Sequence, residues 1–200
     1  MVALMAVTGE LKTGQTPLDP DEAAGLLPTH ISTLGELDEW EAENIYHAQQ
    51  WLRRQKKLDV LNEHFCRELH KKMFSDTWAW AGTFRRSGKN IGCEWTQIGV
   101  QLRQLLDNVT YWIAQQIYST EEAATRFHHL LVLIHPFPNG NGRHARLMAD
   151  LLLRQHQLPE FTWGSRTQHV ADSVLRRRYI EALRAADAGD YQPLLQFVRT

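Results

Sequence analysis

The segment at residues 135–146, which reads HPFPNGNGRHAR, constrains the fold of this chain more than any other stretch. Pro136 and Pro138 disfavour a regular helix here, because proline fixes its own φ and restricts the residue before it. Gly140 and Gly142 supply the backbone freedom that a tight turn needs. The segment is therefore predicted to be a corner between two elements.

Amphipathic helices are predicted on both sides of this corner. Ser119 and Glu122 resemble a capping box, and apolar residues follow at helical spacing. This first helix should end at His135, and a second should run from near Asn141 toward Pro159. Because the negative end of a helix dipole attracts positive charge, we expect the protonated form of His135 to be favoured.

The corner also combines the groups that bind phosphate. A glycine-rich turn that opens a helix points several unpaired backbone N–H groups at one spot, where the helix dipole also attracts an anion. Arg143 and Arg146 are three residues apart and should share a helix face. Guanidinium donors match phosphate oxygens. The residues therefore predict a polyphosphate site with His135 beside it.

These residues resemble the signature of the Fic (Fic/DOC) family, His-x-Phe-x-(Asp or Glu)-Gly-Asn-(Gly or Lys)-Arg-x-x-Arg. The similarity extends from about Leu58 to the C-terminus. It implies a mainly α fold, the Fic helical bundle with a small β-hairpin flap, with residues 1–57 as an N-terminal arm and residues 58–200 as the Fic domain. Residues 16–22 and 40–45 further resemble the mobile mystery protein B subgroup.

The resemblance implies a protein adenylyltransferase, which transfers AMP from ATP to a hydroxyl side chain of a target protein with the help of Mg²⁺. His135 would be the general base that accepts the hydroxyl proton. The other motif residues receive their roles from the same resemblance: Gly140, Asn141, Gly142 and Arg143 for the α- and β-phosphates, Arg146 for the γ-phosphate, and Phe137 as the anchor of the loop.

Asn139 departs from the signature, because most active members carry an acidic residue there that helps to hold Mg²⁺. An amide oxygen can still bind a hard cation, but without a full charge. We therefore expect weaker metal binding with transfer still possible, since nucleotide phosphates supply most of the ligands. The departure keeps open an inactive nucleotide-binding or interaction module, which the subgroup resemblance would pair with a separately encoded DNA-binding regulator, as in a toxin–antitoxin system.

A different enzymatic outcome is transfer of the γ-phosphate, as in the family's kinase-like toxins. That reaction would require ATP to bind in the reverse orientation. Gly142 stands where a lysine would be expected for it, which argues against this alternative.

Residues 80–98 are predicted to form a hairpin, because glycines interrupt short β-prone runs around a turn at residues 87–90. By resemblance this hairpin is a flap that aligns an extended target segment through main-chain pairing. Its candidate target-contacting residues are Thr83, Phe84, Arg85 and Ile91. From the residues alone, a surface hairpin without a partner is the alternative.

An N-terminal helix is predicted over about residues 37–55, after a capping box at residues 33–36. Many family members carry an inhibitory helix with the pattern (Ser or Thr)-x-x-x-Glu-(Gly or Asn), whose glutamate pairs with the last motif arginine. Glu43 fits the glutamate position, although Glu39 occupies the Ser/Thr position. Glu43 is therefore the candidate inhibitory residue, and a merely solvated helix face is the alternative. Helical geometry places Glu41 nearer the centre of the apolar face.

Composition limits the remaining possibilities. Two hundred residues with 43% hydrophobic content suit one domain with its own core. A net charge of -1 gives no electrostatic footprint for direct nucleic-acid binding. Two cysteines make no disulfide framework, and neither a signal peptide nor an apolar run near 20 residues is evident. We therefore expect a cytoplasmic protein without membrane contact.

Overall fold

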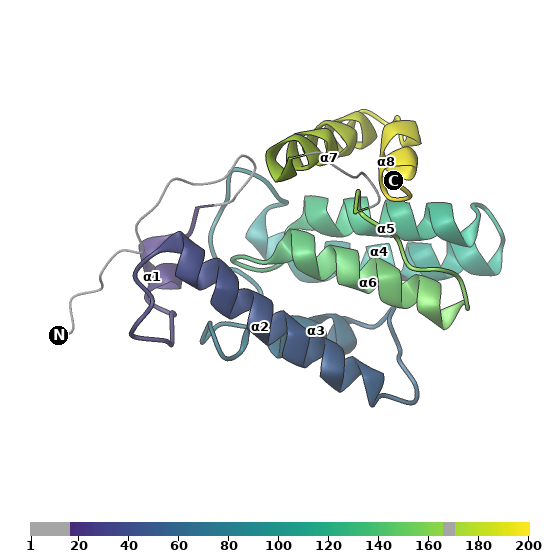
Figure 1. The fold of residues 1–200 in the computed structure, drawn as a ribbon. Coiled ribbons are helices and arrows are strands. Elements are labelled where there is room, and N and C mark those ends of the chain that lie inside the picture. The colour runs from purple at the N-terminus through teal and green to yellow at the C-terminus, as the bar shows by residue number, and fades with distance from the viewer. Residues whose placement is uncertain (1–16, 166–170) are drawn as a thin grey trace.

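The computed structural model describes residues 17–165 and 171–200. Figure 1 shows that this part is built almost entirely of helices, so the predicted mainly α class is confirmed. The helices are α1 (Pro20–Ala23), α2 (Leu34–Arg53), α3 (Glu63–Phe74), α4 (Ile98–Ala114), α5 (Thr120–Ile134), α6 (Asn141–Gln155), α7 (Asp172–Asp187) and α8 (Gln192–Phe197), with a 3₁₀ turn η1 (Trp95–Gln97) before α4.

Helices α5 and α6 form the centre of the molecule and pack along each other (Figure 1). α4 lies against α5, the pair α2–α3 covers one side, and α7–α8 covers the other. Apolar side chains that point inward from α5 and α6, such as Phe127, Leu131, Met148 and Leu152, are almost fully buried. Burial of such side chains is worth about 1.5–3 kcal/mol each, which fixes the relative position of the two helices.

The predicted helix starts agree closely with the structure. Thr33 Oγ1 accepts a hydrogen bond from the Glu36 backbone N–H (3.2 Å), and Glu36 Oε2 accepts one from the Thr33 N–H (3.0 Å). Ser119 caps α5 by accepting from the Glu122 N–H (3.1 Å). Each cap satisfies N–H groups that have no partner within the helix. α2 consequently begins three residues earlier than predicted, at Leu34.

The buried face of α2 carries two polar residues among apolar ones. Its buried positions are Leu37, Glu41, Asn44, Ala48 and Leu52, which recur every three or four residues. Asn44 Oδ1 accepts a hydrogen bond from the Asp76 N–H (2.9 Å), just beyond the end of α3. α2 therefore docks through specific polar contacts as well as apolar packing.

The expected hairpin at residues 80–98 is not found, and within the described residues no β-strand is present. Residues 82–94 instead form an irregular loop. The backbone N–H groups of Arg85 and Cys93 donate to the carbonyls of Pro136 (2.9 Å) and Ile134 (3.3 Å) rather than across a hairpin. The extended contact in this region is an isolated antiparallel bridge between Leu26 and Trp78.

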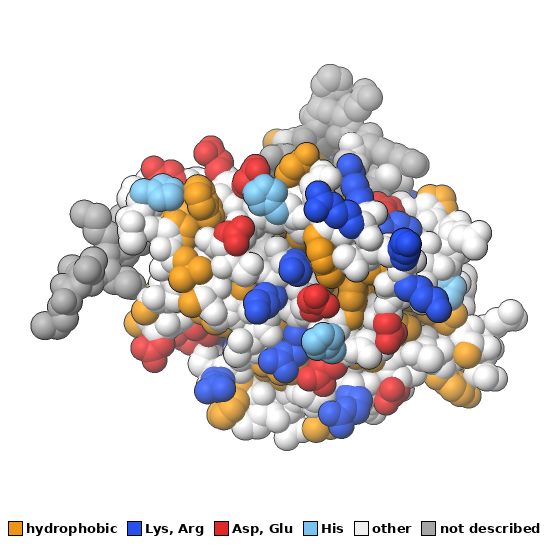
Figure 2. Space-filling model, turned by 90° about the horizontal axis from the view of Figure 1, so that it is seen from below, with side chains coloured by type: hydrophobic (Ala, Val, Ile, Leu, Met, Phe, Trp, Pro, Cys, Tyr) orange, Lys and Arg blue, Asp and Glu red, His pale blue; other side chains and the backbone are white. Residues whose placement is uncertain are grey.

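Charge is mixed over the face shown in Figure 2, where basic side chains lie among acidic and histidine side chains. No helix in the described ranges combines the length and hydropathy that crossing a bilayer requires.

Candidate functional site

The corner between α5 and α6 forms where the prolines and glycines predicted it. His135 follows the last residue of α5 in the left-handed conformation (φ 53°, ψ 60°), and its N–H still donates to the Leu131 carbonyl (3.2 Å). Gly140 is also left-handed (φ 78°), and a Cβ there would lie 2.5 Å from the Phe74 ring. These two residues reverse the chain direction before α6 begins at Asn141.

The side chain of Asn141 closes the corner. Its Oδ1 accepts from the Phe137 N–H (2.9 Å), and its Nδ2 donates to the Phe137 carbonyl (2.8 Å). Phe137 itself is fully buried. The Asn139 carboxamide oxygen accepts from the Gly140 N–H (2.6 Å), so this candidate metal ligand is occupied within its own loop. These hydrogen bonds within the turn join residues that are at most four positions apart in the chain.

His70 of α3 supports the corner from below, although the sequence analysis did not identify it. Its ring stacks on Phe137 with 3.7 Å between centroids, and its Nε2 donates to the Asn139 carbonyl (3.0 Å). Its Nδ1 accepts from the Gly82 N–H (3.0 Å), which ties the start of the 82–94 loop to the same ring. Burial lowers the pKa of His70 well below its usual value and keeps the ring neutral.

The two arginines of α6 have different environments. Arg143 Nη2 donates to Glu41 Oε2 (2.6 Å), and the other oxygen of this carboxylate accepts from Trp78 Nε1 (2.6 Å). Arg146 lies over the Tyr179 ring at 5.1 Å, and within the described residues its buried Nε has no hydrogen-bond partner. One guanidinium is thus neutralised by α2, while the other retains an unused donor.

The predicted pair between Glu43 and Arg146 is not formed. The Glu43 side chain is 65% exposed and lies 3.2 Å from His47 on the outer face of α2. Glu41 is only 2% exposed and provides the acidic contact to the motif, at Arg143. The reason is helical phase, because Glu41 falls on the buried stripe of α2 and Glu43 does not.

The expectation that the helix end would favour protonated His135 is wrong. Burial, followed by the positive charge of Arg85, lowers the pKa of His135 to about 4. Lys89 acts in the same direction, whereas a hydrogen bond with the Val132 backbone opposes it. Desolvation penalises the charged imidazolium more than the helix dipole stabilises it. The imidazole is therefore neutral near pH 7 and able to accept a proton.

The four candidate flap residues divide into two pairs. Thr83 and Ile91 are exposed, as contact with a target would require. Phe84 instead packs toward Phe137, with 5.7 Å between ring centroids, and Arg85 is 2% exposed with its Nε donating to the His135 carbonyl (2.7 Å). Phe84 and Arg85 therefore face the corner rather than the solvent.

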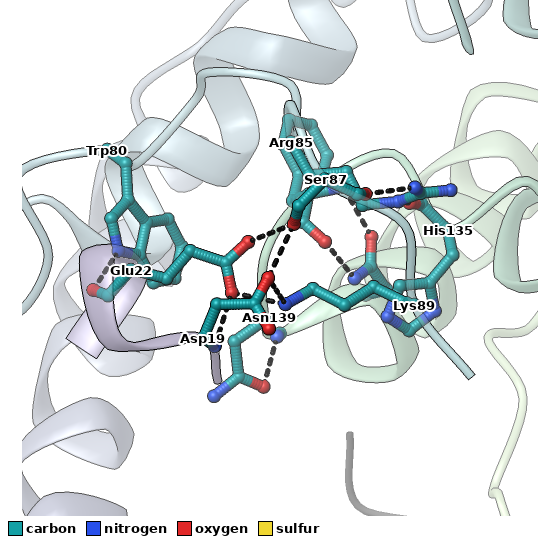
Figure 3. A network of polar contacts seen from close by, with 11 residues as sticks. Asp19, Glu22, Trp80, Arg85, Ser87, Lys89, His135 and Asn139 are labelled. Carbon is teal, nitrogen blue, oxygen red and sulfur yellow. Dashed lines mark hydrogen bonds and ion pairs between the residues drawn. The ribbon is translucent and has the colours of Figure 1, made fainter. Parts of the chain in front are cut away.

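An N-terminal segment holds the same loop from outside (Figure 3). Asp19 Oδ2 accepts from Ser87 Oγ (2.6 Å) and from Lys89 Nζ (3.0 Å), and Glu22 forms an ion pair with the same lysine. The Lys89 side chain is 2% exposed. These partners are 67 to 70 residues apart in the chain, so no local sequence signal could have predicted them.

The sequence of this chain is similar to that of known proteins. The model of the Fic/DOC family matches residues 60–153. "Protein adenylyltransferase Fic" of Aedes aegypti is 30% identical over 120 residues, which cover 58% of this chain and 22% of that protein. "Protein adenylyltransferase fic-1" of Caenorhabditis elegans is 33% identical over 98 residues, or 49% of this chain and 18% of that protein. The matched region thus spans about a fifth of each relative.

Solved structures of Fic proteins share the fold. Fic-1 of C. elegans superposes with a TM-score of 0.66 at 23% identity, over 88% of this chain and 51% of that one. The N-terminal Fic domain of a Bartonella quintana protein gives a TM-score of 0.69 at 18% identity, over 89% of this chain and 91% of that one. BepC of Bartonella tribocorum, solved with bound AMPPNP, gives a TM-score of 0.66 at 18% identity, over 90% of this chain and 97% of that one. The described helices therefore adopt the Fic fold.

Proposed function

Residues 60–153 of this chain form a domain of the Fic/DOC family, and on that premise we propose that the protein is a protein adenylyltransferase. The observation that carries the proposal is the neutral, buried His135 at the corner that opens α6, the helix that carries Arg143 and Arg146. A proton acceptor next to an N-terminal helix end with two guanidinium groups suits transfer at phosphorus. Residues 58–200 would carry this chemistry, and the N-terminal arm its regulation.

In the proposed reaction, a hydroxyl oxygen of the target attacks the α-phosphorus of ATP. A new P–O bond forms, the bond from the α-phosphorus to the bridging oxygen breaks, and pyrophosphate leaves. His135 accepts the hydroxyl proton. The N–H groups at the start of α6 and Arg143 bind the α- and β-phosphates, while Arg146 binds the γ-phosphate. Alignment and charge stabilisation supply most of the catalysis in such a transfer.

Mg²⁺ fits this site as an ion that arrives with the nucleotide. Asn139 is the candidate protein ligand, although its oxygen would have to release the Gly140 N–H. Within the described residues no group of three or more histidine, cysteine or carboxylate side chains could hold a metal alone. When bound, the ion would neutralise phosphate charge.

Nucleotide binding should also tune the base. The pKa of His135 is about 4 with the site in its described state. A bound triphosphate brings several negative charges close to the imidazole, and opposite charge favours the protonated form. The proton affinity of His135 would therefore rise when ATP is present, which couples deprotonation of the target to a filled site.

Label position in ATP separates this proposal from its alternatives. The protein, alone and with a cell lysate, is incubated with ATP labelled at the α- or the γ-phosphate. Adenylyl transfer incorporates only the α label, and phosphoryl transfer only the γ label. Incorporation of neither label, with ATP bound, would overturn the proposal. It would favour the inactive module kept open by Asn139, for which the partner is a separately encoded DNA-binding regulator.

We further propose that the enzyme is autoinhibited, and that Glu41 rather than Glu43 provides the inhibition. Glu41 holds Arg143, a guanidinium that the phosphates need. Its carboxylate is buried, and it is anchored by Trp78. A charge-assisted hydrogen bond is worth about 1.5–3 kcal/mol, and ATP must displace this one to use Arg143.

Glutamine substitutions test this assignment. Glu41→Gln keeps an oxygen that can accept from Trp78 but removes the charge that holds Arg143, so ATP affinity and label transfer should rise about tenfold or more. Glu43→Gln is the matched control on the same helix and should leave both unchanged, because that side chain is exposed. A gain in Glu43→Gln alone would restore Glu43 as the inhibitory residue, and no gain in either would make α2 purely structural.

A further inference from the structure

We propose that Arg85 is a positioning residue for His135: its buried guanidinium clamps the corner of α5 and fixes the orientation of the imidazole. This inference rests on the proposed function, because it concerns the base of that reaction. It assigns to Arg85 an inward role, in place of the contact with a target segment that the sequence implied.

The hydrogen bonds of Arg85 converge on the corner. Nε donates to the His135 carbonyl (2.7 Å), and Nη2 reaches the Ile134 carbonyl at 3.4 Å. The backbone N–H of Arg85 donates to the Pro136 carbonyl (2.9 Å). One residue thus binds three consecutive carbonyls at the point where α5 ends.

The remaining donors of Arg85 hold its own loop. Nη1 donates to the Ser87 carbonyl (2.7 Å), and Nη2 donates to the Cys93 carbonyl (2.5 Å). Burying a guanidinium is costly unless its donors are satisfied. Here the carbonyls at the C-terminus of α5, the negative end of the helix dipole, help to compensate the charge. The same group therefore ties the loop to the corner.

His135 needs such support because of its backbone conformation. A left-handed conformation is unfavourable for a residue with a side chain and persists where the surroundings enforce it. Gly92 provides further evidence of tight packing, because a Cβ there would lie 2.7 Å from both Arg85 Nη2 and His135 Cβ. The loop thus leaves little freedom for the corner to relax.

The charged groups that act on His135 come from this loop and the segment that holds it. Arg85 and Lys89 are the positive groups, and both lower the pKa of the imidazole. Asp19 and Glu22 pair with Lys89 and offset its charge. Removal of the Arg85 charge should consequently raise the pKa of His135, which provides a readout that does not depend on catalysis.

Two variants and a neighbouring control test the clamp. Arg85→Gln removes the charge and most of the hydrogen-bond donors. Arg85→Lys keeps the charge but loses the planar set of guanidinium donors. Arg86→Gln changes an exposed neighbour and is the control. The measurements are thermal unfolding, a ring-NMR titration of His135, and transfer of α label against ATP concentration and pH. The His135 signal is assigned by its loss in His135→Ala.

For folded Arg85→Gln we expect the rate at saturating ATP to fall about 10- to 100-fold, because a displacement near 1 Å can have that effect. The KM for ATP should stay within about threefold, since Arg85 contacts no group proposed to bind phosphate. The pKa of His135 should rise. Arg85→Lys should lose rate at saturating ATP while the pKa of His135 remains low, and Arg86→Gln should match wild type.

The proposal is overturned if Arg85→Lys keeps the wild-type rate, or if Arg85→Gln mainly raises the KM for ATP. It is also overturned if the rate falls only in proportion to the folded fraction while the His135 titration is unchanged. If Arg85→Gln does not fold, Arg85→Lys decides the question. If wild type transfers no label, the proposed function fails, whereas the NMR titration still tests the contact between Arg85 and His135.

Discussion

The corner between α5 and α6 and the loop at residues 82–94 lie against each other, yet they depend on different ranges of the chain. The corner is closed by contacts such as those of Asn141 with Phe137, four residues away. The loop depends on Arg85 reaching His135, 50 residues away, and on Lys89 reaching Asp19, 70 residues away. The turn of the proposed catalytic centre is therefore closed locally, whereas the loop that supports His135 exists only when distant segments dock.

This difference suggests which part of the site can change. Local hydrogen bonds re-form as soon as α5 and α6 pack, so the turn at residues 137–141 should persist whenever the core is folded, whereas the conformation of His135 also depends on Arg85 of the loop. If the N-terminal segment at residues 19–22 left Ser87 and Lys89, the loop would lose these outer contacts and would depend on those of Arg85 with the corner. Substitutions and pH should therefore affect the two regions differently.

The largest effect should come from the corner. We expect His135→Ala to reduce label transfer by about 10²- to 10⁴-fold, because it removes the general base. ATP affinity should change little, since the imidazole acts on the target hydroxyl. Filter-binding or calorimetric titration with ATP, together with the transfer assay, measures both. Wild-type transfer by this variant would exclude His135 from the proposed role.

Glycine substitutions compare the rigidity of the two regions. Gly140→Ala should lower the free energy of unfolding for two reasons. A residue with a side chain in the left-handed conformation costs about 1–2 kcal/mol, and the contact of the new Cβ with Phe74 costs about 1–3 kcal/mol more. Gly88→Ala is the control in the loop, where no atom lies within 4 Å of the added Cβ. Its free energy of unfolding should stay within about 0.5 kcal/mol of wild type. If urea denaturation showed similar losses of unfolding free energy in both variants, the corner would not be more rigid than the loop.

Acid should destabilise the corner before it affects the loop. Burial lowers the pKa of His135 and His144 to about 4, and also lowers that of His70. The unfolded chain binds protons at these sites near pH 6.5, so the free energy of unfolding should fall as pH decreases from about 6.5 to 4, by about 1.4 kcal/mol per pKa unit and site. Asp150 acts in the opposite direction, because its pKa is raised to about 6 and its protonation stabilises the folded protein as pH falls; it is one carboxyl against several histidines.

The loop should respond at lower pH. Ser87 and Lys89 lower the pKa of Asp19, so this pair contributes above the ordinary pKa of the carboxyl and is lost only as pH falls through the lowered value. Urea midpoints from pH 7.5 down to below the ordinary carboxyl pKa of 3.8, combined with histidine ring NMR, test the order. A stability that is flat over this interval, or that rises toward acid, would be the opposite result.

The sequence predicted the corner well because its determinants are local. The cap at Ser119, the prolines of the turn and the three-residue spacing of Arg143 and Arg146 define two helices and a shared face without knowledge of distant residues. The charge state of His135 was not predictable, because the helix dipole can be inferred from the sequence but burial and Arg85 cannot.

The errors also have physical explanations. Glu43 was chosen from a motif, whereas the phase of the buried stripe already placed Glu41 nearer the centre of the face. The phase was the better guide, because burial follows the helix period even where a motif departs from its pattern. Glycine spacing predicts a hairpin, but the backbone N–H groups of Arg85 and Cys93 donate to carbonyls of the distant corner, and contacts between distant residues leave no local signal.

The smallest expected effect concerns the one motif position where the corner departs from the family signature. Asn139→Asp keeps an oxygen that can accept from the Gly140 N–H, so the corner should retain its shape. The added charge attracts Mg²⁺ but repels phosphate, so ATP binding should weaken at low Mg²⁺ and label transfer should increase several-fold at saturating Mg²⁺. Asn90→Asp adds the same charge to the exposed loop and serves as the control. Equal Mg²⁺ dependence of transfer in both variants and wild type would mean that residue 139 does not contact the metal. Residue 139 would then contribute to the corner only through its hydrogen bond with the Gly140 N–H.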